Sequence, residues 1–215
     1  MRAKYVASAI LATAIAVTTP TAVAQAAPTT PVRSGMEINL PETPFTAAKC
    51  TLGVVISPSR AYTAGHCGDV GKAVYNTKGK RIGRITANLG NTRHLDIAVI
   101  TLARGTSARV DAVDWSGRFA KGQPVTKFGV TTGRGRGVIT NPKAKLRGAH
   151  GFSLAPPFLK LQDTFSISAS LRAAPGDSGG PIRNSSGAVI GIMSTSNGNS
   201  ASTFAPVSRV PGYLR

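Results

Sequence analysis

Three short segments of the chain carry side chains that could cooperate in nucleophilic catalysis. Ser178 lies in PGDSGGP (residues 175–181), His66 lies in TAGHC (residues 63–67), and Asp96 begins the apolar run DIAVITL (residues 96–102). A serine hydroxyl becomes a good nucleophile when a base removes its proton, and histidine is the base best suited to neutral pH. A buried carboxylate can hold the imidazole in one tautomer. We therefore predict Ser178 as nucleophile, His66 as general base and Asp96 as the residue that orients the histidine.

The glycines around the serine point to a second catalytic element. Glycine occupies positions 176, 179 and 180. A backbone that presents two N–H groups to a developing oxyanion must bend sharply, and glycine bends without steric cost. We predict that the backbone N–H groups of Gly176 and Ser178 form an oxyanion hole.

Each of these motifs also has an ordinary explanation. An isolated histidine is usually a surface or core residue, and an aspartate before an apolar strand usually marks an edge or a cap. The residues of Gly-Asp-Ser-Gly all favour turns. The three motifs occur together, however, in one order and in a chain that carries an export signal, and this combination favours catalysis.

The N-terminus has the pattern of a secretory signal peptide. Arg2 and Lys4 precede an apolar stretch (residues 5–17), and small residues follow it. This order is typical of a cleaved signal, so we assign residues 1–26 to it and expect a secreted, extracellular protein. A membrane anchor is the alternative, but the stretch is shorter than the ~20 residues that a spanning helix needs. No later segment is apolar for long enough to cross a membrane.

Cys50 and Cys67 are the only cysteines in the sequence. In an exported chain, an even number of cysteines is compatible with one disulfide. Two reduced core cysteines are the alternative. With only three histidines besides, and no zinc-like spacing, the sequence argues against a metal site.

The chain is strongly basic, with 26 Lys and Arg, eight Asp and Glu, and a net charge of +18. Such a charge attracts polyanions. The basic residues are not interleaved with aromatic ones, and no nucleic-acid-binding motif is present, so we expect weak binding to anionic surfaces and no specific nucleic acid. One basic loop, residues 134–147, is interpreted as a solvated face; the alternative is a docking patch for an anionic polymer or an acidic substrate segment. Its basic residues are Arg134, Arg136, Lys143, Lys145 and Arg147.

The rest of the chain predicts an all-β protein. Residues 27–45 are rich in Pro and Thr and lack periodicity, which indicates an extended N-terminal segment or a short pro-segment. From Cys50 onward, short β-type runs alternate with turn residues, and convincing amphipathic helices are absent. The polar stretch 104–117 could join two β subdomains. We therefore expect a catalytic domain over residues 46–215, divided into 46–108 and 109–215.

The motifs around Ser178 and His66 resemble those of chymotrypsin-like (trypsin-like) serine endopeptidases, in which histidine, aspartate and serine follow in this order. The segment FGVTTG (residues 128–133) and the Ala-Pro pair before Gly176 are similar to the bacterial streptogrisin-like and α-lytic-like branch. The resemblance covers roughly residues 48 to 208. It implies two packed antiparallel β-barrels with the active site between them, His66 and Asp96 in the first and Ser178 in the second.

The resemblance also implies roles for other residues. Cys50 and Cys67 match the disulfide of the histidine loop. Ser194, Thr195 and Ser196 match the strand that pairs with the substrate backbone. Counting back from the serine places Arg172 at the base of the specificity pocket, with the small Ala173 beside it. Arg172 could favour acidic substrate side chains, or it could point to solvent, as most arginines do.

The sequence departs from the trypsin pattern at the acid before the serine. Trypsin-type enzymes pair this acid with a newly formed Ile-Val-Gly-Gly terminus, and no such segment follows the signal peptide. Asp177 then needs another partner if it is buried, because an unpaired buried carboxylate is costly. In the bacterial branch that the chain resembles, an arginine just before the Gly-x-Thr-Thr-Gly segment is this partner. Lys127 lies near the matching place, so the resemblance predicts that Lys127 pairs with Asp177. The disulfide that commonly braces the serine loop is missing, since Ala174 occupies its expected position.

Together these features predict a secreted serine endopeptidase that hydrolyses peptide bonds through an acyl-enzyme intermediate. It needs no cofactor, and we expect it to act as a monomer on protein or peptide substrates. One alternative is a catalytically silent relative that binds anionic surfaces. Another is an esterase with the same triad, although the Gly-x-Ser-x-Gly elbow of α/β-hydrolases and strand–helix alternation are both missing.

Overall fold

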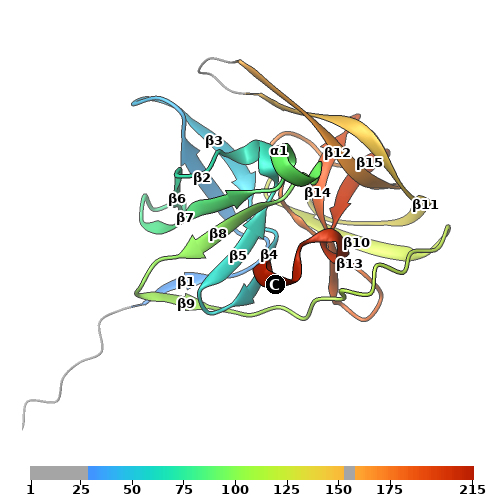
Figure 1. Ribbon diagram of the computed structural model, residues 1–215, viewed down its shortest axis with the longest axis horizontal. Helices are drawn as coiled ribbons and strands as arrows, with labels where there is room; N and C mark the ends of the chain where they lie inside the picture. Colours follow the sequence, from blue (N-terminus) through green and yellow to red (C-terminus); the bar gives the residue numbers. More distant parts are fainter. Residues whose placement is uncertain (1–28, 153–157) are drawn as a thin grey trace, which may run out of the picture.

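The computed structural model describes residues 29–152 and 158–215, and within them almost all regular structure is β (Figure 1). The described helices are the four-residue α1 (Gly90–Arg93) and three single 3₁₀ turns, η1 (Gly65–Cys67), η2 (Val207–Arg209) and η3 (Gly212–Leu214). The predicted signal peptide lies outside the described residues. In the described part of the chain, no helix has the length and apolar character that crossing a membrane requires.

The first half of the chain forms a curved, seven-stranded antiparallel sheet. Successive side chains of a strand point to opposite faces, and in some strands of this sheet burial alternates accordingly. In the strand 37–41, for example, Ile38 and Leu40 are buried and their neighbours are not. In sheet order the strands are β3 (Ala47–Thr51), β2 (Glu37–Pro41), β6 (Ala73–Tyr75), β7 (Arg81–Asn88), β8 (Ala98–Leu102), β5 (Arg60–Thr63) and β4 (Val54–Ser57).

The segment 27–45 differs from its prediction. It was expected to precede the catalytic domain, but β2 is an interior strand of the first sheet, paired with β3 and β6. The short strand β1 (Thr30–Val32) pairs with β9 (Thr106–Ala108). Two apolar side chains alternating over only five residues drive this burial, and the surrounding Pro and Thr masked that pattern. The domain therefore begins earlier than residue 46.

The second half forms a closed barrel around Ile139, Ile167, Ile182 and Phe204, which are all buried. Closure leaves every barrel strand with two neighbours, so backbone hydrogen bonds are satisfied all round. In barrel order the strands are β10 (Pro124–Gly129), β11 (Gly133–Phe152), β12 (Leu159–Ala169), β15 (Ser202–Pro206), β14 (Val189–Ser196) and β13 (Pro181–Arg183).

The two sheets confirm the predicted all-β, two-barrel fold class, with the first sheet a half-barrel and the second a closed ring. The polar stretch after β9 passes from one to the other. Within it, Asp111 joins both units: its carboxylate accepts a hydrogen bond from the Val55 N–H (2.9 Å) and pairs with Arg183 of β13 (2.6 Å).

The predicted basic loop 134–147 is instead part of the 20-residue strand β11. It pairs with β12 in a long hairpin that is interrupted by register shifts between Ile139 and Lys145. The pattern was obscured because the strand alternates basic residues with glycines 133, 135 and 137 rather than with apolar side chains. Beyond the barrel, β12 reaches the first sheet, where the Phe165 N–H donates to the His94 carbonyl (2.7 Å).

Candidate active site

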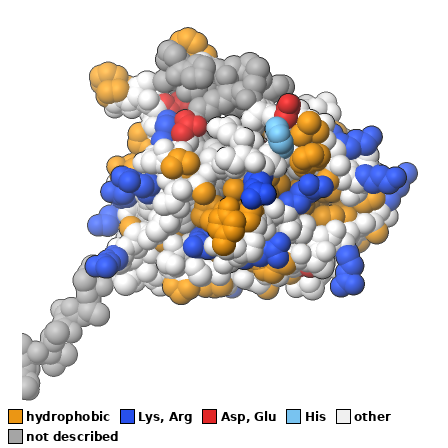
Figure 2. All heavy atoms as spheres, viewed as in Figure 1, with side chains coloured by type: hydrophobic (Ala, Val, Ile, Leu, Met, Phe, Trp, Pro, Cys, Tyr) orange, Lys and Arg blue, Asp and Glu red, His pale blue; other side chains and the backbone are white. Residues whose placement is uncertain are grey.

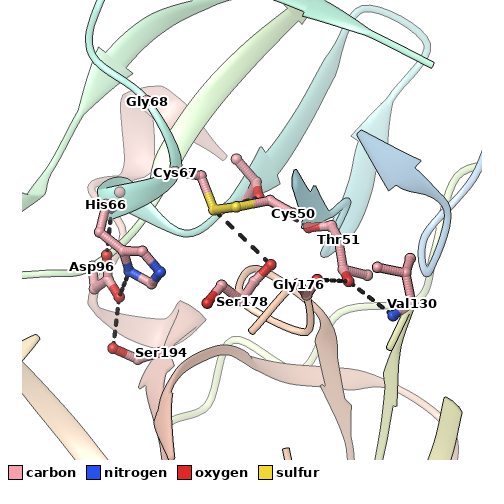
Figure 3. Close-up of a disulfide and its surroundings, with 12 residues drawn as sticks. Cys50, Thr51, His66, Cys67, Gly68, Asp96, Val130, Gly176, Ser178 and Ser194 are labelled. Carbon is pink, nitrogen blue, oxygen red and sulfur yellow. Dashed lines mark hydrogen bonds and ion pairs between the residues drawn. A yellow bond between two sulfur atoms is a disulfide. The ribbon is translucent and has the colours of Figure 1, made fainter. Parts of the chain in front are cut away.

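His66 and Ser178 line one cleft where the two sheets meet, and Asp96 lies buried beside His66. His66 lies on η1 directly after β5, and Asp96 lies just before β8. The His66 Nδ1 atom is 2.8 Å from Asp96 Oδ2, and the His66 backbone N–H donates to Asp96 Oδ1 (2.9 Å). Figure 3 shows the imidazole between the Asp96 carboxylate and Ser178, which approaches from the second barrel. His66 and Ser178 line the same cavity.

The Asp96 carboxylate is completely buried and well supplied with donors. Besides His66, Ser194 of β14 donates its hydroxyl to Oδ2 (2.6 Å). Burial raises the pKa of Asp96, but the charge and hydrogen bonds of His66 and the hydrogen bond from Ser194 outweigh it and hold the pKa below its usual value. The carboxylate therefore stays ionised and can fix the tautomer and orientation of the imidazole.

Two further contacts of Asp96, both from β12 of the second barrel, were not predicted from the sequence. Gln162 donates its side-chain amide to Oδ1, and the Thr164 hydroxyl accepts the Asp96 backbone N–H (2.9 Å). A Cβ atom at Gly90 would lie 2.0 Å from Gln162 Oε1, so glycine at this position lets the amide approach. Because 66 residues separate Gln162 from Asp96, no local pattern could have revealed the contact.

We expect Gln162→Met to lower kcat for peptide hydrolysis by about tenfold and to leave KM unchanged. Methionine keeps the volume but removes a hydrogen bond to a charged group, which is worth about 1.5–3 kcal/mol. Steady-state kinetics on a peptide substrate would measure the split between kcat and KM. Gln123→Met, at a glutamine whose carbonyl accepts the Ala120 N–H, is the matched control. A proportionate fall in both variants would contradict a specific effect on Asp96.

The loop around Ser178 has the sharp bends that its glycines suggested. Gly176 and Gly179 have φ values of 98° and 86°, in the left-handed region that favours glycine. The loop is fixed to β3, because the Thr51 hydroxyl donates to the Gly176 carbonyl (2.8 Å) and the Thr51 N–H donates to the Ser178 carbonyl (2.8 Å). Among the described residues, no acceptor binds the backbone N–H of Gly176 or Ser178, so both remain available to an oxyanion.

Asp177 lies buried behind the serine with the partner that the sequence suggested. Lys127 of β10 is also buried, and its Nζ atom is 3.0 Å from Asp177 Oδ2. The other oxygen, Oδ1, accepts the backbone N–H groups of Thr131 (2.9 Å) and Thr132 (3.1 Å). Burial raises the pKa of Asp177, but hydrogen bonds from Thr132, Lys127 and Thr131 outweigh it and hold the pKa below its usual value. The FGVTTG segment thus forms a cradle for this carboxylate.

The predicted disulfide is confirmed: Cys50 of β3 is bonded to Cys67 of η1. The alternative of two reduced cysteines is wrong. The bond ties the residue after His66 to the strand that also holds the serine loop through Thr51 (Figure 3). It therefore joins the two segments that carry His66 and Ser178, the predicted base and nucleophile.

The cleft beside Ser178 has a volume of about 280 Å³, and all but one of the residues predicted to bind substrate line it. Ala173, Ser194, Thr195 and Ser196 line it. Arg172 does not line the cleft: Leu171 and Ala173 are buried, whereas Arg172 between them is exposed. Its placement at the base of the pocket is therefore corrected, and nothing in the cleft supports an acidic preference arising from Arg172.

Comparison with known proteins identifies the family of the chain. The family model described as Trypsin matches residues 32–213. Among curated proteins, none matches the chain significantly.

Solved structures with this fold include three bacterial proteases. Cellulomonas bogoriensis chymotrypsin is 22% identical with a TM-score of 0.60, over 84% of this chain and 93% of that one. Thermobifida fusca protease A is 21% identical with a TM-score of 0.63 (86% and 96%), and Nocardiopsis protease is 22% identical with a TM-score of 0.61 (82% and 93%). At these identities the structures support the fold, whereas the family model covers most of the chain. The protein belongs to the trypsin family of serine endopeptidases.

Proposed function

We propose that the protein is a secreted serine endopeptidase in which Ser178, His66 and Asp96 form the catalytic triad. The observation that carries this proposal is the imidazole of His66, which is held by the buried carboxylate of Asp96 on one side and faces Ser178 on the other (Figure 3). Family membership makes peptide bonds the substrate.

The proposed reaction has two halves. His66 takes the proton of the Ser178 hydroxyl as the oxygen attacks the scissile carbonyl, and the backbone N–H groups of Gly176 and Ser178 stabilise the oxyanion. His66 then gives the proton to the leaving amine, which leaves an acyl-enzyme. Water repeats the sequence with His66 as base, and Ser178 is released with its proton restored. Throughout, the Asp96 carboxylate stabilises the imidazolium and does not itself accept the proton.

The substrate backbone is proposed to lie along the end of β14. Residues Ser194, Thr195 and Ser196 line the cleft beside Ser178, and an extended peptide can add to such a segment as a further strand. The Ser194 hydroxyl is engaged with Asp96, so this residue would contact the substrate through its backbone. Its side chain instead couples substrate binding to the position of the triad acid.

Two features support an extracellular location. The disulfide between Cys50 and Cys67 is typical of oxidising compartments, and the first 26 residues have the pattern of a signal peptide. The serine loop is further proposed to need no newly formed N-terminus, because Lys127 already neutralises the buried Asp177.

Labelling with a fluorophosphonate tests this proposal. The purified protein should react, peptide mapping should place the label on Ser178, and Ser178→Ala should abolish the signal. Digestion of a denatured protein, with cut sites read by mass spectrometry, should then show peptide-bond cleavage. Labelling without cleavage of any peptide would favour an esterase, and absence of both would favour a silent binding protein.

A further inference from the structure

A polar groove on the second barrel opens beside the catalytic cleft. It has a volume of about 380 Å³ and shares Thr195 and Ser196 with the cleft. In the barrel register, Ser168 of β12 lies opposite Thr203 of β15, which lies opposite Thr195 of β14. No carboxylate lines the groove, and most of its side chains carry a hydroxyl or an amide. These are Thr140, Ser168, Thr195, Ser196, Asn197, Ser200, Ser202 and Thr203.

Arg147 supplies a positive charge behind this groove. It precedes Gly148, which lines the groove, and its side chain is partly buried against β12. The guanidinium donates to the Ser166 carbonyl (2.6 Å) and hydroxyl (3.1 Å), and to the Ser168 hydroxyl (3.0 Å). None of the ion pairs found in residues 29–152 and 158–215 includes Arg147. Its charge therefore lacks a carboxylate partner within the described protein.

The hydroxyls of the groove can donate hydrogen bonds to a ligand, and the Arg147 charge strengthens them as donors. Ser168 accepts a hydrogen bond from Arg147, so its own proton must point elsewhere, and Ser168 lines the groove. The Thr195 and Thr203 hydroxyls are 2.7 Å apart. One of them donates to the other, which leaves the second proton for another acceptor. Hydroxyl donors polarised by a nearby guanidinium suit an anionic acceptor such as a carboxylate.

We infer that this groove binds an acidic side chain of the substrate, upstream of the cleaved bond, and that Arg147 determines this specificity. The inference rests on the proposed function. If a peptide pairs with the end of β14 as an antiparallel strand, the residues before the cleaved bond run from Ser194 past Thr195 and Ser196, and these last two line the groove. The chain as a whole is basic, with a net charge of +18, and Figure 2 shows Lys and Arg side chains spread widely over one face of the molecule and few acidic ones.

Paired peptides test the groove directly. Fluorogenic substrates would carry Glu or Gln at the second, third or fourth residue before the cleaved bond. We expect kcat/KM to favour Glu by about tenfold at one of these positions, the size of one charge-assisted hydrogen bond. The ratio should fall below about two in Arg147→Met and be intermediate in Arg147→Lys, since lysine lacks the fork of donors. Arg134→Met, at an exposed arginine of the same strand, is the matched control and should keep the preference.

Two further measurements separate the possible failures. Melting curves would show whether Arg147→Met folds; if it does not, Ser168→Ala removes the groove hydroxyl without touching the charge, and the Glu preference should fall in that variant. Binding of the same peptides to Ser178→Ala, read by fluorescence anisotropy, requires no catalysis. If Ser178→Ala binds the Glu peptides more tightly than the Gln peptides but the wild-type protein cleaves neither, the proposed function would be overturned and the groove would stand. Equal binding of Glu and Gln peptides, or a preference that survives both Arg147→Met and Ser168→Ala, would overturn the inference.

Discussion

Replacing Ser178 with alanine is expected to lower kcat for peptide hydrolysis by about 10⁶-fold while the protein stays folded. Ser178 is partly exposed at the cleft, and its loop is held through backbone carbonyls by Thr51, so the loop should keep its conformation in the variant. His66→Ala should cost about as much, because the base and the nucleophile act in one step. The double variant should be no worse than either single one.

Steady-state kinetics on a peptide substrate, with active-site titration of each preparation, would measure these losses of kcat. Asp96→Asn gives a graded comparison: the imidazole would lose the acceptor for Nδ1, and kcat should fall by about 10⁴-fold. Ser208→Ala, at a serine of η2, serves as a control that should keep full activity. Additive losses in Ser178→Ala/His66→Ala would show that the two side chains do not act together.

Removing the cation beside Asp177 is expected to give the largest change in stability. Lys127→Met leaves a buried carboxylate without its charge partner, which costs about 3–5 kcal/mol. For a domain of this size the melting temperature should fall by roughly 10 °C. Activity should fall too, because Asp177 adjoins Ser178 and its cradle fixes the oxyanion loop. Lys121→Met, at an exposed lysine, should change neither property. An unchanged melting temperature together with unchanged activity in Lys127→Met would show that this pair has no role.

The effect should depend on pH in a defined direction. In the wild type the pKa of folded Asp177 is below its usual value, so its contribution to stability is present above the unfolded value of about 4 and is lost as pH falls through the folded pKa. In Lys127→Met, burial without the cation should raise the pKa, and protonation then stabilises the variant as pH falls. The difference in melting temperature should therefore be largest at neutral pH and shrink in acid. Lys127→Met/Asp177→Asn should recover part of the loss at neutral pH.

The residues predicted to carry the chemistry could be recognised in the sequence because their neighbours constrain them locally. Gly176 and Gly179 adopt positive φ around Ser178, and such bends require glycine whatever the rest of the fold does. The Lys127 and Asp177 pair was also predicted. A buried carboxylate needs a cation, and the resemblance of FGVTTG (residues 128–133) to the bacterial branch indicated which segment supplies it. Strand 37–41 and the basic strand β11 were missed, because proline and glycine hid their alternation.

Residue types and short-range patterns were enough to predict Ser178, His66 and Asp96 as the triad, to pair the two cysteines and to assign the all-β class. The surroundings of these residues depend on the fold as a whole. In the structure Arg172 lies outside the cleft and the Gln162 amide donates to Asp96. Arg147 lies behind a hydroxyl-lined groove and donates to Ser168. These outcomes depend on strand register and on how the two barrels meet. A shift of one residue in register moves a side chain to the opposite face, and no local pattern fixes which strands meet across 66 residues of chain.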